Sequence, residues 1–343
     1  MPERRIGVIG GSGLYELEGL EDVRWVKVRT PFGEPSDAFG VGRLGARELV
    51  FLPRHGRGHR VMPSELNFRA NIFGLKALSV EWVISISAVG SMREDIAPLD
   101  LVVPDQFYDH TRRRISSFFG DGIVAHVGMA DPVCPDLAAR LHRAAVETGA
   151  RVHRGGTYLC IEGPQFSSKA ESGIYRSWGV DVIGMTNMPE AKLAREAELC
   201  YATLALVTDY DVWHESEEAV SVEAVIQNLL KNVATAKDVI RRVVPTIDSP
   251  RMCPCPTLLQ KAVITEPSAF HPATRKRLDL LIGKYFPQPL KRKRGPGDPP
   301  RLDVGGVQGR GPGGSDGRKA GGRRRRDPTD ERASPPGGKS RRG

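Results

Sequence analysis

The segment Ile6-Gly-Val-Ile-Gly-Gly-Ser-Gly-Leu14 contains an apolar run that passes directly into a glycine-rich turn. The run predicts a buried β-strand over Ile6–Ile9, and the glycines predict a tight turn at its carboxyl end. Other short apolar runs alternate with stretches of helical spacing, the clearest of which is Ser221–Val244. This alternation is typical of an α/β fold in which helices cover both faces of a sheet.

The positive charge of the chain is concentrated at its C-terminal end. The sequence has 50 Lys and Arg against 41 Asp and Glu, a net charge of +9. Residues 287–343 carry +10, are rich in Gly and Pro and hold no aromatic residue, whereas residues 1–286 carry −1. We therefore expect one folded domain over 1–286 and a disordered basic tail over 287–343, because the tail cannot offset its ordering entropy by burial. The basic isoelectric point says nothing about nucleic-acid binding by the folded part.

Simple patterns narrow the class of protein. No uninterrupted apolar window of about 18 residues exists and the N-terminal segment does not have the pattern of a secretory signal, so we expect no membrane span. Five cysteines in this length do not make a disulfide framework, which favours a cytoplasmic location. The pair Cys253-Pro-Cys255 is either two ordinary thiols at a turn or a local redox or disulfide pair. The histidines are not spaced as zinc ligands, so no metal site is expected.

Groups suited to binding an anion follow three of the predicted strands. The glycine-rich turn offers backbone N–H groups and the Ser12 hydroxyl, although it fits neither the dinucleotide fingerprint nor the P-loop pattern. Arg54 and His55 follow a second strand, and Ser87-Ala88 end a third. Carboxyl ends of parallel strands meet at one edge of a sheet, so these groups indicate a site for a small oxyanion such as phosphate. Each has a structural alternative when taken singly, a tight turn for the glycines and a solvated basic loop for Arg54 and His55.

An acidic pair follows a fourth predicted strand. Thr208, Asp209 and Asp211 come directly after an apolar run that should be buried. Burial raises the pKa of a carboxyl group and can keep a proton available for general acid catalysis near neutral pH. A capping or turn role for both acids is an equally good interpretation from spacing alone.

Six ordered strings make the sequence more specific than these patterns. They are GGSGLYELEG from Gly10, TPFGEPSD from Thr30, RHGRGHRVMPSELNFRANI from Arg54, EGPQFSSKAES from Glu162, GMTNMPEAKLAREAELCYA from Gly184 and TDYDVW from Thr208. In these strings the chain resembles the methylthioadenosine phosphorylases of the trimeric purine nucleoside phosphorylase family. The resemblance implies a single α/β domain with a central mixed β-sheet flanked by helices, and it does not extend into residues 287–343.

The resemblance also implies a reaction. In this family orthophosphate attacks C1′ of a ribosyl group while the purine leaves, which is a pentosyl transfer that needs no cofactor because orthophosphate is a co-substrate. The implied phosphate-binding residues are Ser12, Arg54, His55, Ser87, Ala88 and Thr186. Asp209 would be the catalytic residue, stabilising or protonating the leaving purine at N7, and Asp211 would accept from its 6-amino group.

The remaining substrate contacts are implied in the same way. The implied nucleoside-binding residues are Phe166, Ile183, Met185, Thr208, Asp209, Asp211, Val222, Val225, Ile226 and His126. Family members of this kind donate the residue at the position of His126 from a neighbouring subunit. The resemblance therefore implies a homo-oligomer, most often a trimer. Asp209 and Ser167 stand where 6-oxopurine members place Asn and Glu, which favours adenine as the base.

Two other functions remain open from the sequence. One is a 6-oxopurine or methylthioinosine phosphorylase on the same scaffold. The other is nucleic-acid binding through the basic tail, in which Lys291–Arg294 and Arg323–Arg326 would contact phosphates without reading sequence. An idle extension is an equally good interpretation of the tail.

Overall fold

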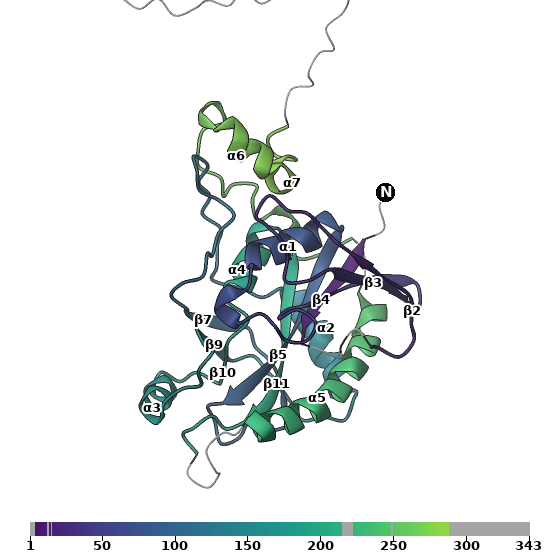
Figure 1. Ribbon diagram of the computed structural model, residues 1–343, viewed down its shortest axis with the longest axis vertical. Coiled ribbons are helices and arrows are strands. Elements are labelled where there is room, and N and C mark those ends of the chain that lie inside the picture. The colour runs from purple at the N-terminus through teal and green to yellow at the C-terminus, as the bar shows by residue number, and fades with distance from the viewer. Residues whose placement is uncertain (1–3, 12–13, 15, 215–221, 248–249, 288–343) are drawn as a thin grey trace, which may run out of the picture. The chain divides into compact units, whose positions relative to one another are not determined.

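The architecture centres on β5 (Val80–Ser91), which lies in the middle of a mixed sheet of eleven strands in the described part of the chain (Figure 1). The computed structural model describes residues 4–11, 14, 16–214, 222–247 and 250–287, without the side chains of residues 222–225. β5 pairs in parallel with β1 (Arg5–Gly10) and β11 (Cys200–Asp209), and antiparallel with β10 (Val182–Gly184).

The sheet extends away from β5 in three directions. Beyond β1 it continues through β4 (Arg47–Pro53), β3 (Phe39–Leu44) and β2 (Leu20–Val26). Beyond β10 it continues through β9 (Thr157–Ile161) and β7 (Gln106–His110), and beyond β11 through β6 (Leu101–Val103) and β8 (Val152–Arg154). Because β1, β4, β5 and β11 are mutually parallel, their carboxyl ends share one edge, where such sheets bind ligands.

Alternate residues of the central strands feed two apolar cores, one on each face of the sheet. In β1, Ile6 and Val8 pack in the core that contains α2 (Pro135–Val146) and α5 (Val222–Val243). Ile9 points the other way, into the core that contains α1 (Phe68–Ala77) and α4 (Glu190–Glu196). Figure 1 shows these helix pairs on opposite faces. Successive side chains of a strand point to opposite faces, so each face of the sheet has its own apolar core covered by helices. The predicted α/β fold is confirmed.

The helical spacing of Leu66, Ala70, Phe73 and Ala77 predicts a helix over Glu65–Leu78 with Ser64 as its N-cap, but the helix begins later. Ser64 lies in a 3-10 turn over Pro63–Glu65. The cap of α1 is Asn67, whose Oδ1 accepts from the Ala70 N–H at 3.0 Å. Three further helices are α3 (Lys169–Ser177), α6 (Pro272–Arg277) and α7 (Asp279–Ile282).

The sequence also predicts that the chain has no membrane span and that it ends in a basic tail. Among the described helices, none combines the length and the apolar character that crossing a bilayer would require. Residues 288–343, which make up almost all of the predicted tail, lie outside the described residues, and so does Ser12.

Candidate functional site

An interruption in strand pairing opens one side of β5 near its carboxyl end. β1 pairs with β5 as far as Ser85, and β10 pairs with it from Gly90 onward. Within the described residues, positions 86–89 therefore have no partner strand on this side, while β11 covers the other side. Side chains from the end of β4 and from the segment after β10 reach this interruption. It is the part of the sheet edge where the sequence predicts an anion site.

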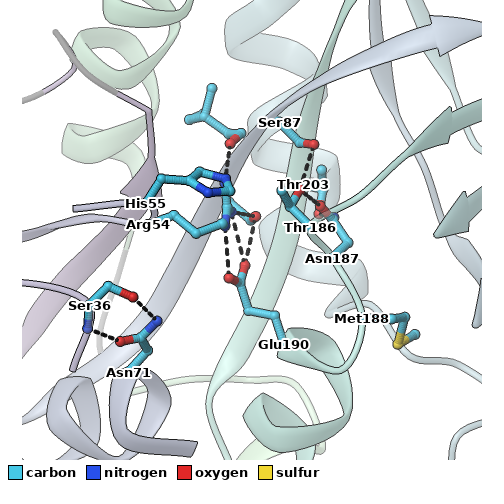
Figure 2. A network of polar contacts seen from close by, with 12 residues as sticks. Ser36, Arg54, His55, Asn71, Ser87, Thr186, Asn187, Met188, Glu190 and Thr203 are labelled. Atoms are coloured by element: carbon cyan, nitrogen blue, oxygen red, sulfur yellow. Dashed lines mark hydrogen bonds and ion pairs between the residues drawn. The ribbon is translucent and has the colours of Figure 1, made fainter. Parts of the chain in front are cut away.

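Arg54, directly after β4, is buried and its guanidinium is bound on several sides (Figure 2). Nε and Nη2 donate to the two carboxylate oxygens of Glu190 at 3.0 and 3.1 Å, and Nη1 donates to the Ile86 carbonyl at 2.9 Å. Nη2 also donates to Ser85 Oγ at 2.6 Å. Within the described residues these bonds use four of the five guanidinium N–H groups. The two parallel N–H groups of Nε and Nη2, which could bind an anion, bind the carboxylate of Glu190 instead. One Nη1 hydrogen remains for a ligand.

Glu190, the first residue of α4, is the partner that the sequence interpretation did not assign. Its Oε1 also accepts from Ser85 Oγ at 2.9 Å and from the Tyr201 hydroxyl at 2.8 Å. Burial alone would lower the pKa of Arg54, but the charge of Glu190 raises it above its ordinary value. A fully buried carboxylate needs this many donors to offset its lost hydration. Glu190 therefore fixes the orientation of Arg54 and keeps it charged.

The His55 ring lies beside Arg54 in a neutral state. Its Nδ1 is 2.8 Å from the Val61 carbonyl, and a carbonyl only accepts, so Nδ1 carries the hydrogen. Burial lowers the pKa of His55 to about 4. Nε2 then has a free lone pair at neutral pH and can accept a hydrogen bond.

Hydroxyl groups gather on the other side of the interruption (Figure 2). Ser87 Oγ lies 2.8 Å from Thr186 Oγ1 and 3.0 Å from the Tyr158 hydroxyl. Burial raises the pKa of Tyr158 to about 12, so its hydroxyl keeps its proton. Because Ser87 follows Ile86, whose carbonyl binds Arg54, the predicted residues Arg54, Ser87 and Thr186 are brought together.

The glycine-rich turn begins at the same place. The Arg54 backbone N–H donates to the Gly10 carbonyl at 2.9 Å, which aligns the ends of β1 and β4. Ser12, two positions further along, lies outside the described residues, so its predicted contact with an anion stays a prediction.

The acidic pair lies at the end of β11, next to the end of β5. Asp209 pairs with Gly90, and its Oδ1 accepts from the Asp211 N–H at 2.8 Å. A Cβ atom added to Gly90 would lie only 2.9 Å from that oxygen, so glycine is required for this close approach. Burial raises the pKa of Asp211, which also accepts from the Ser172 hydroxyl of α3. Ser172 is a second buried partner that the sequence interpretation did not assign.

Thr208 links the acid to the main chain of β5. Its hydroxyl lies 2.6 Å from Asp209 Oδ2 and 3.2 Å from the Val89 carbonyl. The hydroxyl can donate to either oxygen, so Thr208 holds the Asp209 carboxyl group close to the main chain of β5.

The residues suited to binding an anion and the carboxyl group of Asp209 lie on or beside the same strand, β5, a short distance apart. Ser87 and Gly90 are three residues apart on β5, a distance of about 10 Å at the usual strand rise. Along the facing segment, Ile183 pairs with Gly90 and Thr186 contacts Ser87, so Met185 lies between the two groups in sequence. This separation is of the size expected when one sugar ring lies between an anion and a base.

The predicted walls of the nucleoside site differ in exposure. Ile183 is buried, at 5% exposure, and packs in a small core to which Met185 also contributes. Phe166 is 48% exposed in the single chain, so it does not form an enclosed wall there. The Met185 carbonyl accepts from Arg114 Nη1 at 2.8 Å, and the same nitrogen donates to the Met188 carbonyl at 2.6 Å. Arg114 is a further residue that the sequence left unassigned, because three consecutive arginines look like a solvated loop.

The remaining predicted contacts lie on α5 and on an exposed segment. The side chains of Val222 and Val225 lie outside the described residues, and Ile226 is 47% exposed. The first half of α5 is nevertheless anchored beside the acids, because Asn228 Nδ2 donates to the Thr208 carbonyl at 2.7 Å. His126 is exposed in the single chain, where its backbone N–H donates to the Ala262 carbonyl at 2.8 Å.

The fold is similar to those of solved structures. A methylthioadenosine phosphorylase from an Antarctic soil metagenomic library has a TM-score of 0.78 and 51% identity, covering 82% of this chain and 99% of that one. A methylthioadenosine phosphorylase from Schistosoma mansoni, solved with adenine, has a TM-score of 0.68 and 38% identity, covering 71% of this chain and 91% of that one.

Two relatives have a higher sequence identity to this chain than these solved structures. An S-methyl-5′-thioadenosine phosphorylase from Geobacter sulfurreducens is 61% identical over 284 residues, covering 82% of this chain and 99% of the relative. A protein of the same name from Koribacter versatilis is 56% identical, covering 83% and 97%. The model of the phosphorylase superfamily matches residues 5–245, which span all the described site residues. The chain therefore belongs to the phosphorylase superfamily.

Proposed function

We propose that the protein is a pentosyltransferase that catalyses phosphorolysis of 5′-methylthioadenosine to adenine and 5-methylthioribose 1-phosphate. Relatives at 61% and 56% identity carry the name of this activity, and solved relatives bind adenine. The observation that carries the proposal is the placement of Arg54, Ser87 and Thr186 at one point of β5 and of Asp209 beside Gly90, three residues further along the same strand. Orthophosphate is the co-substrate, and the proposed reaction requires no cofactor.

Phosphate would occupy the interruption beside β5. The free Nη1 hydrogen of Arg54, the hydroxyls of Ser87 and Thr186 and the backbone of Ala88 supply donors, and Ser12 would add another. His55 Nε2 would accept from the P–OH group of hydrogen phosphate, because its lone pair is free at neutral pH. A phosphate held in this way is oriented for attack on C1′ without a separate base, since it already carries the nucleophilic oxygen.

Asp209 would act on the leaving purine. Negative charge develops on the purine as the bond from C1′ to N9 breaks, and a protonated carboxyl at N7 stabilises it. Thr208 supports this role by holding the Asp209 carboxyl group at the end of β11, beside Gly90 of β5. General acid catalysis of this kind typically contributes a factor of roughly 10² to 10⁴ in rate.

Asp211 would select the base. A carboxylate oxygen accepts from the 6-amino group of adenine, whereas the 6-oxo group of hypoxanthine offers no donor at that position. Ser172 orients Asp211 from α3, and Ile183 contributes an apolar surface for the ring. Phe166 would complete the slot once its exposed ring is covered by substrate or by a neighbouring subunit.

The 5′ end of the nucleoside would lie in an apolar pocket. Met185 would contact the sugar, and Val222, Val225 and Ile226 would surround the methylthio group. His126 would close the pocket from the neighbouring subunit of a homotrimer, which accounts for its exposure in the single chain. The molar mass in solution from light scattering checks the trimer, and a monomer with full activity would contradict it.

A phosphate-dependent release assay tests the function and its nearest rival together. We expect rapid release of adenine from methylthioadenosine only when phosphate is present, and slower release of hypoxanthine from inosine or methylthioinosine. Faster turnover of the 6-oxopurine nucleosides would reject the aminopurine assignment in favour of the rival phosphorylase. Phosphate-independent release would contradict phosphorolysis itself.

We also propose that residues 1–286 contain all the catalytic machinery and that the protein acts in the cytoplasm, a reducing compartment that suits a chain with five cysteines and no disulfide bond among them. Deletion of residues 287–343 should leave phosphorolysis intact. Nucleic-acid binding by the full-length protein that weakens steeply with salt and disappears on deletion would favour the tail hypothesis.

A further inference from the structure

Four cysteines from three distant parts of the chain meet in the core. Cys134 immediately precedes α2, Cys200 is the first residue of β11, and Cys253 and Cys255 flank Pro254 in the segment after α5. Their four Sγ atoms all lie within 4.8 Å of one another. The fifth cysteine, Cys160, is not part of the group. The sequence drew attention only to the close pair Cys253 and Cys255, and could not show that two remote cysteines join it.

The separation of the sulfur atoms suits a shared metal ion better than disulfide bonds. All five cysteines are unbonded, and the Sγ atoms of Cys200 and Cys253 lie 3.3 Å apart, well beyond an S–S bond length of about 2.05 Å. In a tetrahedral site with Zn–S distances of about 2.3 Å, the sulfur atoms are about 3.8 Å apart. The observed cluster is within easy adjustment of that geometry. Among the described residues the group contains four sulfur ligands and no His, Asp or Glu, which is a ligand set that structural zinc sites use.

We propose that Cys134, Cys200, Cys253 and Cys255 bind one Zn²⁺ ion as a closed structural site. On binding, each thiol loses its proton, so four protons are released and a tetrathiolate complex with a net charge of −2 forms. Zinc is not oxidised or reduced, so the step needs no other reactant. This proposal revises the expectation of no metal site, which rested on histidine patterns.

The surroundings of the cluster favour thiolates. Arg251 Nη1 lies 4.0 Å from Cys200 Sγ and brings a positive charge to the site, although the same guanidinium also pairs with Glu81 at 3.3 Å. Cys134 lies at the N-terminus of α2, where unpaired backbone N–H groups favour negative charge.

Burial makes the site closed rather than catalytic. Cys134, Cys200 and Cys255 are at most 1% exposed, whereas Cys253 is partly exposed and marks the side from which an ion can enter. Cys200 and Asp209 lie at opposite ends of β11, nine residues and about 30 Å apart at the usual strand rise. An ion at the cluster therefore cannot touch the reacting atoms. Its effect would be to fasten the segment after α5 to α2 and β11.

Metal analysis of the full-length protein tests the proposal. The protein is expressed without a metal-binding tag in zinc-supplemented medium, and its metal content is measured by mass spectrometry. We expect about one zinc per chain, released stoichiometrically when an organomercurial titrates the thiols. Replacement by Co²⁺ should give the visible absorption of tetrahedral cobalt with thiolate-to-metal charge transfer in the near ultraviolet. Stripping the ion should lower the thermal midpoint of the enzyme.

Two variants provide a matched comparison. Cys255→Ser should lose zinc, while Cys160→Ser, which removes the one cysteine outside the cluster, should keep it. If Cys255→Ser does not fold, the mercurial titration of the unmodified protein still decides the question. Four free thiols without bound metal, two disulfide bonds in their place, or copper or iron instead of zinc would each overturn the proposal. None of these results would affect the proposed phosphorolysis.

Discussion

The carboxylate of Glu190 holds the guanidinium of Arg54 through two parallel hydrogen bonds of 3.0 and 3.1 Å, with both side chains at most 2% exposed. Such a fork-to-fork pair fixes the plane of the guanidinium as well as its position. The remaining Nη1 hydrogen is therefore directed by a residue that does not itself face the phosphate. This makes Glu190 a positioning residue for the proposed phosphate site.

Glu190→Gln should impair phosphate binding more than nucleoside binding. The amide cannot accept from both Arg54 nitrogens, so the guanidinium loses its fixed orientation and part of its neutralising charge. A charge-assisted hydrogen bond is worth about 1.5 to 3 kcal/mol, which predicts a rise in KM for phosphate of about 10- to 100-fold. Steady-state kinetics with each substrate varied in turn measure this split.

Glu18→Gln is the matched control for that variant. Glu18 pairs with Arg241 at the surface and is 90% exposed, so its loss should change neither constant. If Glu190→Gln does not fold, Glu190→Asp tests the same relationship with the charge retained. A folded Glu190 variant with unchanged KM for phosphate would rule out the positioning role.

Gly90→Ala should slow turnover without unfolding the protein. The new methyl group would lie 2.9 Å from Asp209 Oδ1 and 3.2 Å from Ile183, so the acid must move by a few tenths of an ångström or more. Displacement of a catalytic group by about 1 Å can cost about 10² in rate. We expect a fall in kcat of that order. Gly173→Ala, in α3 with open space around its Cβ, is the control, and equal activity of both variants would contradict the prediction.

Glu196→Gln should stabilise the protein above neutral pH. Burial raises the pKa of Glu196 to about 7, against an ordinary value of 4.5, so the native state favours the protonated form. The stabilising contribution is complete below pH 4.5 and is lost as the pH rises through 7, a loss of about 3 kcal/mol. Gln keeps the shape and can still accept from the Phe118 N–H, now 2.7 Å from Oε2, without becoming charged. Urea unfolding at pH 5 and pH 9 measures the difference, and identical pH dependence in both proteins would refute it.

His55 should make the protein less stable as the pH falls, whereas Glu196 makes it less stable as the pH rises. Burial lowers its pKa to about 4, against an ordinary value of 6.5, so the native state favours the neutral form. Its contribution is present above pH 6.5 and is lost as the pH falls through 4, again about 3 kcal/mol. The Glu196→Gln background isolates this effect. Adding His55→Asn, which retains a donor for the Val61 carbonyl, should remove that part of the acid sensitivity, and an unchanged profile would argue against a neutral buried His55.

The strand ends could be predicted from sequence because their signals are local. The apolar run of β1 stops at glycines and that of β4 stops at Arg54, so each strand and its polar terminus lie within a few residues of one another. β3 was not predicted because Gly40 and Gly42 interrupt its apolar residues. An added Cβ at Gly42 would lie 3.0 Å from Leu20, so that glycine serves the packing of β2 rather than a loop.

The partners of the site residues could not be predicted because they are remote in sequence. Glu190 is 136 residues from Arg54, and Arg114 is 71 residues from Met185. Nothing in the local pattern of a charged residue says whether it faces solvent or a buried partner. The same limit applies to the cysteine cluster, whose members come from three separate segments.

Asp209→Asn tests the central claim, that an acid at the end of β11 helps the purine leave while phosphate is held beside β5. The measurement is kcat for adenine release from methylthioadenosine at saturating phosphate, together with KM for phosphate. The account predicts a fall in kcat of about 10² to 10⁴ with little change in phosphate binding, because the amide can donate a hydrogen bond to N7 but cannot transfer a proton to it. Turnover close to that of the unmodified enzyme would contradict it.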